Sequence, residues 1–337
     1  MVRRFPRRSR DQWGKIASHR IISILRRHRL CNLRQLEAKI SEAGPPGVRA
    51  QPLSIKDGLK YLLERGTVKI ALARNSAPGI TVDFYALEEF SESRYTDRGR
   101  RDFILEHWPL YRAASGTTEF CGDVLETLVD KALSACPGMI RLGKPGETFN
   151  NYWIDGKRFD NNPPLDHVVY YRERGLSLGL EDKNWREWIY PNDALIPTLL
   201  RKCLQNGYVP ILITRKLPYL SRLFFKQVGA LGFETHFMYL HPSLERQFEL
   251  IRHKDGIGFA DLRFSLEVPP QLISFFQSVV PKEVESTARR FELNRELIDG
   301  FLKKEISYYE FMSRLGVFPE IEPDDFEMWD YYDEYGL

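Results

Sequence analysis

Two short apolar runs on either side of a polar turn limit the possible folds of this chain more than any other stretch of its sequence. Residues 163–184 read PPLDHVVYYRERGLSLGLEDKN, and Gly175 follows charged residues where the chain can reverse. An antiparallel hairpin that turns between residues 173 and 174 places Asp166 opposite Glu181, with roughly 5 Å between their Cβ atoms. Lys183 lies two residues beyond Glu181, so the pleat returns it to the same face. The sequence therefore predicts that two carboxylates and one ammonium group converge.

Two carboxylates at this distance repel each other when both are ionised, so either one is protonated or a cation lies between them. Oxygen ligands that are open to water suit a hard divalent ion such as Mg²⁺. Such an ion polarises a phosphate oxygen, and a neighbouring lysine stabilises the charge that develops on the phosphate. These residue types fit phosphodiester hydrolysis. The alternative is that Asp166 and Glu181 are ordinary strand-edge acids and that Lys183 pairs with one of them as a surface ion bridge.

The same residues resemble the signature of the PD-(D/E)xK superfamily, the restriction-endonuclease-like nucleases. That signature is an acidic residue, a gap of hairpin size and then (D/E)xK. Asp166 matches the first acid, Glu181 the second acid and Lys183 the lysine, while the usual proline is displaced by one place to Pro164. The resemblance extends over roughly residues 115–265 and implies a metal-dependent nuclease.

The segment before the hairpin resembles the first core helix of that fold. Thr117–Ala135 reads TTEFCGDVLETLVDKALSA, with apolar residues at helical spacing and Thr117 or Thr118 available as a cap. Glu126 borders the apolar stripe. The resemblance implies that Glu126 is a third acid of the metal site.

The segments after the hairpin continue the expected order. Asn192–Asn206 has the pattern of a helix, and Tyr208–Thr214 reads as a buried strand that ends at Arg215 and Lys216. We expect these two cations to contact a neighbouring phosphate. The fold class is therefore predicted to be α/β, with a restriction-endonuclease-like αβββαβ core.

The resemblance also implies a cofactor and a set of roles. Mg²⁺ is the expected metal, and Mn²⁺ is expected to substitute for it. Lys183 is expected to position or activate the attacking water and to neutralise the phosphate. Strand alternation turns the side chains of His167 and Asp182 to the opposite face, although the backbone carbonyl of Asp182 is within reach of a metal. The implied catalytic residues are Asp166, Glu181, Lys183 and Glu126, and the implied metal ligands are Asp166, Glu181, Asp182 and Glu126.

The first 90 residues have the order of elements of a winged helix-turn-helix domain. Asn32 and Ser54 are candidate caps of the second and third helices. The predicted helices are 12–29, 33–43 and 55–64, and the predicted strands are 67–73 and 80–87. On this interpretation the third helix is the recognition helix and the turn between the strands is the wing. Winged helices that bind proteins or act as linkers are the alternative.

Charge is distributed unevenly, although the net charge of the 337 residues is only +3. Residues 1–34 carry eleven basic side chains and one acid, whereas residues 318–337 carry eight acids and no base. A basic arm of this kind is typical of contact with nucleic-acid phosphates, and a solvated helix face is the alternative. The residues expected to contact DNA are Arg3, Arg4, Arg7, Arg8, Lys56, Lys60, Arg74, Arg215 and Lys216.

Composition limits the location of the protein. No apolar run approaches the length of a membrane span, and no apolar segment follows the basic start as in a secretory signal. The widely spaced cysteines form no CxxC pair, which fits a reducing cytoplasm, with the protein associated with the nucleoid.

These observations together predict five regions and a function. The regions are a DNA-binding domain at 1–90, a connector at 91–115, a nuclease domain at 116–270, a helical extension at 271–317 and an acidic tail at 318–337. The predicted function is a Mg²⁺-dependent DNA endonuclease that acts on double-stranded DNA in restriction, phage defence, transposition or repair. It would act as a homodimer or under a gating partner. The alternative is a DNA-binding regulator or assembly subunit with an inactive nuclease-like fold.

Overall fold

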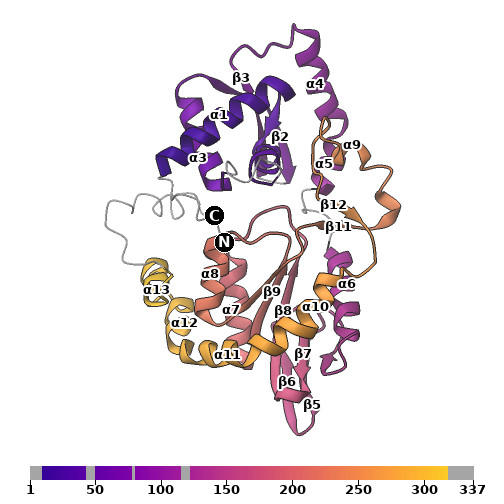
Figure 1. Cartoon of the computed structure of the whole chain (residues 1–337), viewed down its shortest axis with the longest axis vertical. Coiled ribbons are helices and arrows are strands. Elements are labelled where there is room, and N and C mark those ends of the chain that lie inside the picture. The colour runs from indigo at the N-terminus through magenta and orange to yellow at the C-terminus, as the bar shows by residue number, and fades with distance from the viewer. Residues whose placement is uncertain (1–9, 43–49, 78–79, 115–121, 318–337) are drawn as a thin grey trace, which may run out of the picture. The chain divides into compact units, whose positions relative to one another are not determined.

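The computed structural model describes residues 10–42, 50–77, 80–114 and 122–317 (Figure 1). The chain has a mixed α/β architecture and divides into two units, one of residues 1–118 with 243–264 and one of residues 119–242 with 265–337. Residues 243–264, which we expected in the domain at 116–270, belong to the first unit. None of the described helices combines the length and the apolar composition that a membrane crossing requires.

The first unit begins with helices followed by a β-hairpin, in the predicted order. Its elements are α1 (Arg10–His28), β1 (Cys31–Asn32), α2 (Leu33–Glu37), the π-helix η1 (Ala38–Glu42), α3 (Pro52–Glu64), β2 (Val68–Ala77) and β3 (Ile80–Leu87). The strands form a sheet in the order β1-β3-β2. Buried residues of α1 and α3, among them Ile21, Leu25, Ile55 and Leu59, form the core of this part.

One of the two predicted helix caps in this unit is confirmed and the other is wrong. Asn32 caps α2, since its side chain accepts from the backbone N–H of Gln35 at 2.9 Å and the Gln35 side chain accepts from the Asn32 N–H at 2.9 Å. Ser54 lies inside α3, which begins at Pro52 with Gln51 as its N-cap. Proline is suited to the first turn of a helix because its φ is already helical and the missing N–H has no partner there.

Further elements complete the first unit. These are α4 (Tyr95–Glu106), α5 (Trp108–Ala114), α9 (Glu249–Arg252) and β12 (Leu262–Phe264). Phe84 of β3 packs with Ile104 and Trp108, and the ring of Tyr111 lies 5.8 Å from that of Phe259. The segment predicted as a connector at 91–115 thus contains helices α4 and α5, which belong to this unit.

The second unit is built on a five-stranded sheet in the order β10-β9-β8-β7-β4. Its strands are β4 (Met139–Leu142), β7 (His167–Tyr171), β8 (Leu176–Lys183), β9 (Val209–Thr214) and β10 (Leu231–Glu234). Neighbouring strands from β4 to β8 are antiparallel, whereas β8, β9 and β10 are parallel. A parallel strand needs a crossover, and α7 (Leu195–Asn206) and α8 (Tyr219–Val228) provide the two that are required here.

Helices cover both faces of this sheet (Figure 1). One face packs Val168, Tyr170 and Leu212 against α7 and α8, together with α12 (Arg295–Leu302) and α13 (Tyr308–Arg314). The other face packs Val169, Leu178 and Leu180 against α6 (Gly122–Ser134) and against the continuous helical stretch of α10 (Pro270–Ser274), η5 (Phe275–Val279) and α11 (Val280–Leu293). Alternate residues of each strand therefore face different helical layers. The helices expected as a separate extension at 271–317 pack within this unit.

Smaller elements lie beside the sheet. They are the hairpin β5 (Phe149–Ile154) and β6 (Lys157–Asn161), the strand β11 (Met238–Leu240) and the 3₁₀ turn η4 (Pro242–Leu244). The tip of the β5–β6 hairpin meets the β7–β8 turn, where Asp155 accepts from the Arg172 guanidinium at 2.7 Å and Lys157 donates to the Gly175 carbonyl at 3.1 Å.

The β7–β8 hairpin has the predicted register. His167 pairs with Leu180 and Tyr171 with Leu176, and one further step of this ladder places Asp166 opposite Glu181. The turn is a 3₁₀ helix, η3 (Arg172–Arg174), closed by Gly175 at φ 61°. Glycine adopts this left-handed conformation without a steric penalty from a Cβ atom.

Candidate functional site

The ammonium group of Lys183 lies between the two carboxylates that were predicted to converge. Its Nζ is 2.9 Å from Asp166 Oδ2 and 2.8 Å from Glu181 Oε2. Asp166 directly precedes β7, and its Oδ2 also accepts from the backbone N–H of Asp182 at 2.7 Å. The Glu181 side chain is only 4% exposed, whereas those of Lys183 and Asp166 are 17% and 19% exposed. The pair of opposed strands therefore holds three charged groups at a place that solvent still reaches.

A second lysine, which the sequence analysis did not identify, completes the ion-pair group. Lys202 on α7 donates to Glu181 Oε1, so each oxygen of Glu181 accepts from a different lysine. The close approach of α7 to β8 depends on Gly179, where a Cβ atom would lie 2.7 Å from Cys203 Sγ. Lys202 borders the apolar stripe of α7. This position is the only feature of the sequence that could have indicated that Lys202 faces the sheet.

Glu126 lies near the same end of the sheet, on α6. Partial burial raises the pKa of its carboxyl group, and the negative charges of Asp166 and Asp182 raise it further. The carboxylates are thus close enough to repel one another. This is the position predicted for a third acid, whereas the predicted caps Thr117 and Thr118 lie outside the described residues.

His167 and Asp182 form a buried pair on the face that α6 covers. The distance from His167 Nε2 to Asp182 Oδ2 is 2.8 Å, and neither side chain is exposed. Burial raises the pKa of Asp182, and it opposes protonation of His167, but the neighbouring carboxylates outweigh it and raise the pKa of His167. Strand alternation predicted this separation of Asp182 from Glu181 and Lys183. The Oδ1 atom of Asp182 is buried and has no hydrogen-bond partner among the described residues.

The donor set fits a hard divalent cation in its chemistry, although it is not arranged as a finished metal site. Asp166, Glu181 and Glu126 offer carboxylate oxygens, and after burial the negative charges of Asp166 and Asp182 contribute to the raised pKa of Glu126. No group of three or more His, Cys, Asp or Glu side chains is arranged around a common metal position within the described ranges. The cation between Asp166 and Glu181 is the Lys183 ammonium group itself. A metal ion bound between these two carboxylates would therefore require this ammonium group to move away from one of them.

Arg215 requires a correction. We expected it to contact a phosphate, but it is 1% exposed, and its guanidinium donates to the backbone carbonyl of Trp185 at 3.3 Å and to that of Arg186. Its role is to hold the loop that follows β8. The sequence was misleading because an arginine after a strand can turn into the protein wherever backbone carbonyls offer partners. Lys216 is half-buried, with its Nζ 3.0 Å from His236 Nδ1.

The other residues expected to contact DNA lie in the first unit. Lys60 on α3 and Arg74 on β2 are exposed, and Lys56 on α3 is half-exposed. Arg3, Arg4, Arg7 and Arg8 lie outside the described residues.

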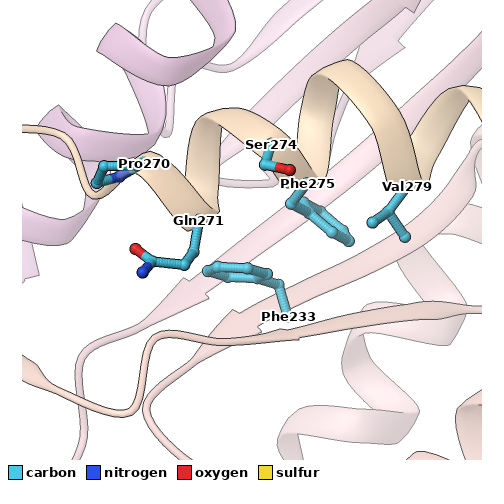
Figure 2. Close-up of a pocket in the computed structure, with 6 residues that line it drawn as sticks. All are labelled: Phe233, Pro270, Gln271, Ser274, Phe275 and Val279. Atoms are coloured by element: carbon cyan, nitrogen blue, oxygen red, sulfur yellow. The ribbon is translucent and has the colours of Figure 1, made fainter.

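A pocket elsewhere in the second unit does not overlap the ion-pair group. It lies between β10 and the helical stretch from α10 to η5, and it has a volume of about 330 Å³ (Figure 2). None of the residues that line it is titratable, so it offers no acid or base. They are Phe233, Pro270, Gln271, Ser274, Phe275 and Val279.

No protein-family model matches the chain, and no curated protein and no solved structure matches it. The resemblance to PD-(D/E)xK nucleases therefore stays a prediction from Asp166, Glu181 and Lys183. What can be said of function depends on the geometry of these residues and of their neighbours.

Proposed function

We propose that the chain is a metal-dependent nuclease that hydrolyses phosphodiester bonds in DNA. The observation that supports this most is the convergence of Asp166 and Glu181 on one lysine at the end of the β7–β8 hairpin, with the Glu126 carboxylate nearby. Acidic residues that face each other across a hairpin and share a lysine two residues further on suit a phosphate substrate and a Mg²⁺ ion.

Each residue has a role that follows from its contacts. Asp166, Glu181 and Glu126 would hold the metal ion, which when bound would polarise the phosphate as a Lewis acid. The Lys183 ammonium group donates to Asp166 and Glu181 in the free protein. It would turn toward the negative phosphate once a metal ion neutralises these acids. Lys202 contacts the other oxygen of Glu181, so it would keep that carboxylate oriented while Lys183 moves.

DNA would be held by the first unit. Its helix order, its hairpin and the exposed cations Lys60 and Arg74 support the proposal that α3 and the β2–β3 hairpin contact the double helix. Contacts of this kind are made mainly to phosphates and weaken as salt is added.

Replacement of Lys183 by alanine tests the catalytic part of the proposal. Plasmid DNA would be incubated with wild type, Lys183→Ala and the matched control Lys226→Ala, which removes an exposed lysine on α8, each with Mg²⁺ or with EDTA. Because Lys183 would stabilise charge in the transition state, its loss should slow cleavage about 100-fold or more while DNA binding is kept. Cleavage by Lys183→Ala at the wild-type rate would remove the assignment.

A non-catalytic DNA-binding protein is the second candidate. Both oxygens of Glu181 already accept from lysines, which neutralises this carboxylate without a metal ion. Calorimetric titration with Mn²⁺ distinguishes the candidates, because a nuclease should bind Mn²⁺ in the wild type and lose affinity in Asp166→Asn. DNA binding with neither Mn²⁺ binding nor cleavage would favour the second candidate.

A further inference from the structure

The first unit contains a basic pocket that the proposed function does not use. It has a volume of about 360 Å³, which is at the low end of the range for small-molecule sites. It lies where the end of α1 meets the first turns of α4 and the loop after α9. Its lining residues are Arg27, His28, Arg29, Thr96, Gly99, Arg100, Phe103 and Asp255. We propose that this pocket binds a phosphate group.

Two of the arginines have carboxylate partners. Arg29 donates to both oxygens of the buried Asp97, at 2.6 and 3.2 Å. This bidentate contact fixes the position of the Arg29 guanidinium group. Arg27 pairs with Asp255 at 3.1 Å, but both side chains are more than half exposed, so the pair is weak and Arg27 can turn toward a ligand. Among the described residues, Asp97 and Asp255 are the carboxylates that form ion pairs with arginines of the pocket.

Arg100 lines the pocket and lies over the Phe103 ring, 5.2 Å from its centroid, whereas Lys39 lies outside the lining but close enough to act on His28 by its charge. Arg100 donates to the backbone carbonyls of Leu30, Asp255 and Gly256 at 3.5, 3.3 and 2.9 Å, and Lys39 donates to the carbonyl of Lys254 at 3.1 Å. Neither forms an ion pair with a carboxylate in the described parts of the chain. Burial lowers the pKa of both groups, because water that would stabilise their charge is excluded. An anion in the pocket would offset this uncompensated positive charge.

His28 is partly buried and lies among the same positive charges. Burial, followed by the charges of Lys39, Arg100 and Arg27, lowers its pKa to about 4, although Asp255 opposes this. The imidazole is therefore neutral near pH 7, and it can donate one hydrogen bond to a ligand without adding a further charge.

The arrangement suits a phosphate better than a single carboxylate. Guanidinium groups from two elements, Arg27 on α1 and Arg100 on α4, line the pocket, and their planar donor groups suit the oxygens of a tetrahedral oxyanion. Each nitrogen of Arg100 already donates to a backbone carbonyl, so a phosphate would accept from its remaining N–H groups. Thr96, in the first turn of α4, adds a hydroxyl group to the lining. The phosphate could belong to a nucleic-acid backbone or to a small phosphorylated molecule, and the pocket chemistry is the same for both. The inference does not depend on the nuclease assignment, because no residue is shared with that site.

Inorganic phosphate is the direct probe. The full chain, with ¹⁵N-labelled histidine, would be titrated with phosphate at pH 7 while chloride is adjusted to keep the ionic strength constant. A bound anion should raise the pKa of His28 and shift its ring signals in a saturable way. The variant Arg27→Gln should weaken phosphate binding about tenfold, the loss expected for one charged hydrogen-bond donor. Its matched control is Arg26→Gln, which removes the same charge from an exposed neighbour that does not line the pocket.

Two results would overturn the proposal. One is the absence of a saturable shift of the His28 signals, and the other is an equal loss of phosphate affinity in Arg26→Gln and Arg27→Gln. Because Arg27 makes only an exposed pair, its replacement should leave the fold intact, which circular dichroism would check. Anisotropy with duplex DNA then identifies the source of the phosphate. A selective loss of DNA affinity in Arg27→Gln, with competition by phosphate, assigns the pocket to the nucleic-acid backbone. Unchanged DNA affinity together with weakened phosphate binding assigns it to a small ligand.

Discussion

At the scale of single residues, the charged side chains of this chain differ in whether a neighbouring group of opposite charge neutralises them. The charges of Asp166, Glu181, Lys183 and Lys202 neutralise one another in a network at the end of two strands. Arg100 and Lys39 in the other unit have carbonyl dipoles instead of anions as partners. A network of opposite charges can exchange one cation for another, whereas an excess of one sign attracts a ligand of the other sign.

The pH dependence of stability should reveal the burial of His28 and its positive surroundings. Its pKa is about 4 in the folded protein, against 6.5 for the ordinary side chain, so the unfolded chain binds more protons between these values. The free energy of unfolding should therefore fall as the pH drops from about 6.5 to 4. The contribution is about 2 kcal/mol, after a discount for the partial exposure of the ring.

Urea unfolding at pH 7.5 and 4.5, in buffers without phosphate, measures this contribution. His28→Gln should lose less stability between the two values than wild type, because glutamine does not titrate. His19→Gln, which replaces an exposed histidine on the same helix, is the control and should follow wild type. A variant His28→Gln with the same pH dependence as wild type would contradict the expectation.

At the scale of elements, the packing of one helix against one strand assembles the ion-pair group. The β7–β8 hairpin opposes Asp166 and Glu181 by its register alone, whereas Lys202 arrives only because α7 crosses β8 closely. Gly179 permits this approach, since a side chain there would meet both Cys203 and Leu165 at 2.7 Å. The hairpin thus supplies three of the charges and the helix packing supplies the fourth.

Replacement of Gly179 by alanine should push α7 away from β8. The added methyl group is too close to its neighbours, so we expect a loss of about 1–3 kcal/mol in the free energy of unfolding. Thermal unfolding followed by circular dichroism measures the change. Gly300→Ala on α12 is the control, because the added methyl group would lie 3.7 Å from the Glu305 carboxylate, an ordinary contact distance. A gain in stability for Gly179→Ala would show that this close packing is not required.

At the scale of the whole molecule, charge is separated by region more than by net value. The chain carries a net charge of only +3, yet its first 34 residues are strongly basic and its last 20 are strongly acidic. The first unit also exposes cations on α3 and β2, the elements proposed to contact DNA. Binding to DNA should therefore depend steeply on salt.

Replacing a single cation that contacts DNA should reduce this salt dependence, whereas replacing a cation elsewhere should not. The logarithm of DNA affinity is plotted against the logarithm of salt concentration for Lys60→Ala, Arg74→Ala and the control Lys282→Ala. Each of the first two should lower the slope by about one unit, because one phosphate contact is lost. Lys282 lies on α11 in the other unit with a side chain that is 80% exposed, and its removal should leave the slope unchanged. Equal slopes for all three variants would place the DNA contacts elsewhere.

Features that depend on neighbours along the chain could be predicted from the residue pattern alone. Alternation and turn chemistry predicted the β7–β8 register, and with it the meeting of Asp166, Glu181 and Lys183, because a hairpin relates residues through one short connection. Helical periodicity predicted α1, α3 and α7 to within a few residues, since an apolar stripe must face a core.

Contacts between side chains that are distant in the sequence became known only from the folded chain. Lys202 reaches Glu181, Arg215 turns inward to carbonyl groups, and residues 254–256 bring their carbonyls to Lys39 and Arg100. These contacts join segments that are far apart in the sequence. No periodicity or residue spacing predicts them, because the angles at which helices cross and the paths of loops depend on how whole helix and sheet surfaces pack. Local patterns therefore predicted the centre of the candidate site, whereas its fourth charge and the basic pocket depend on long-range packing.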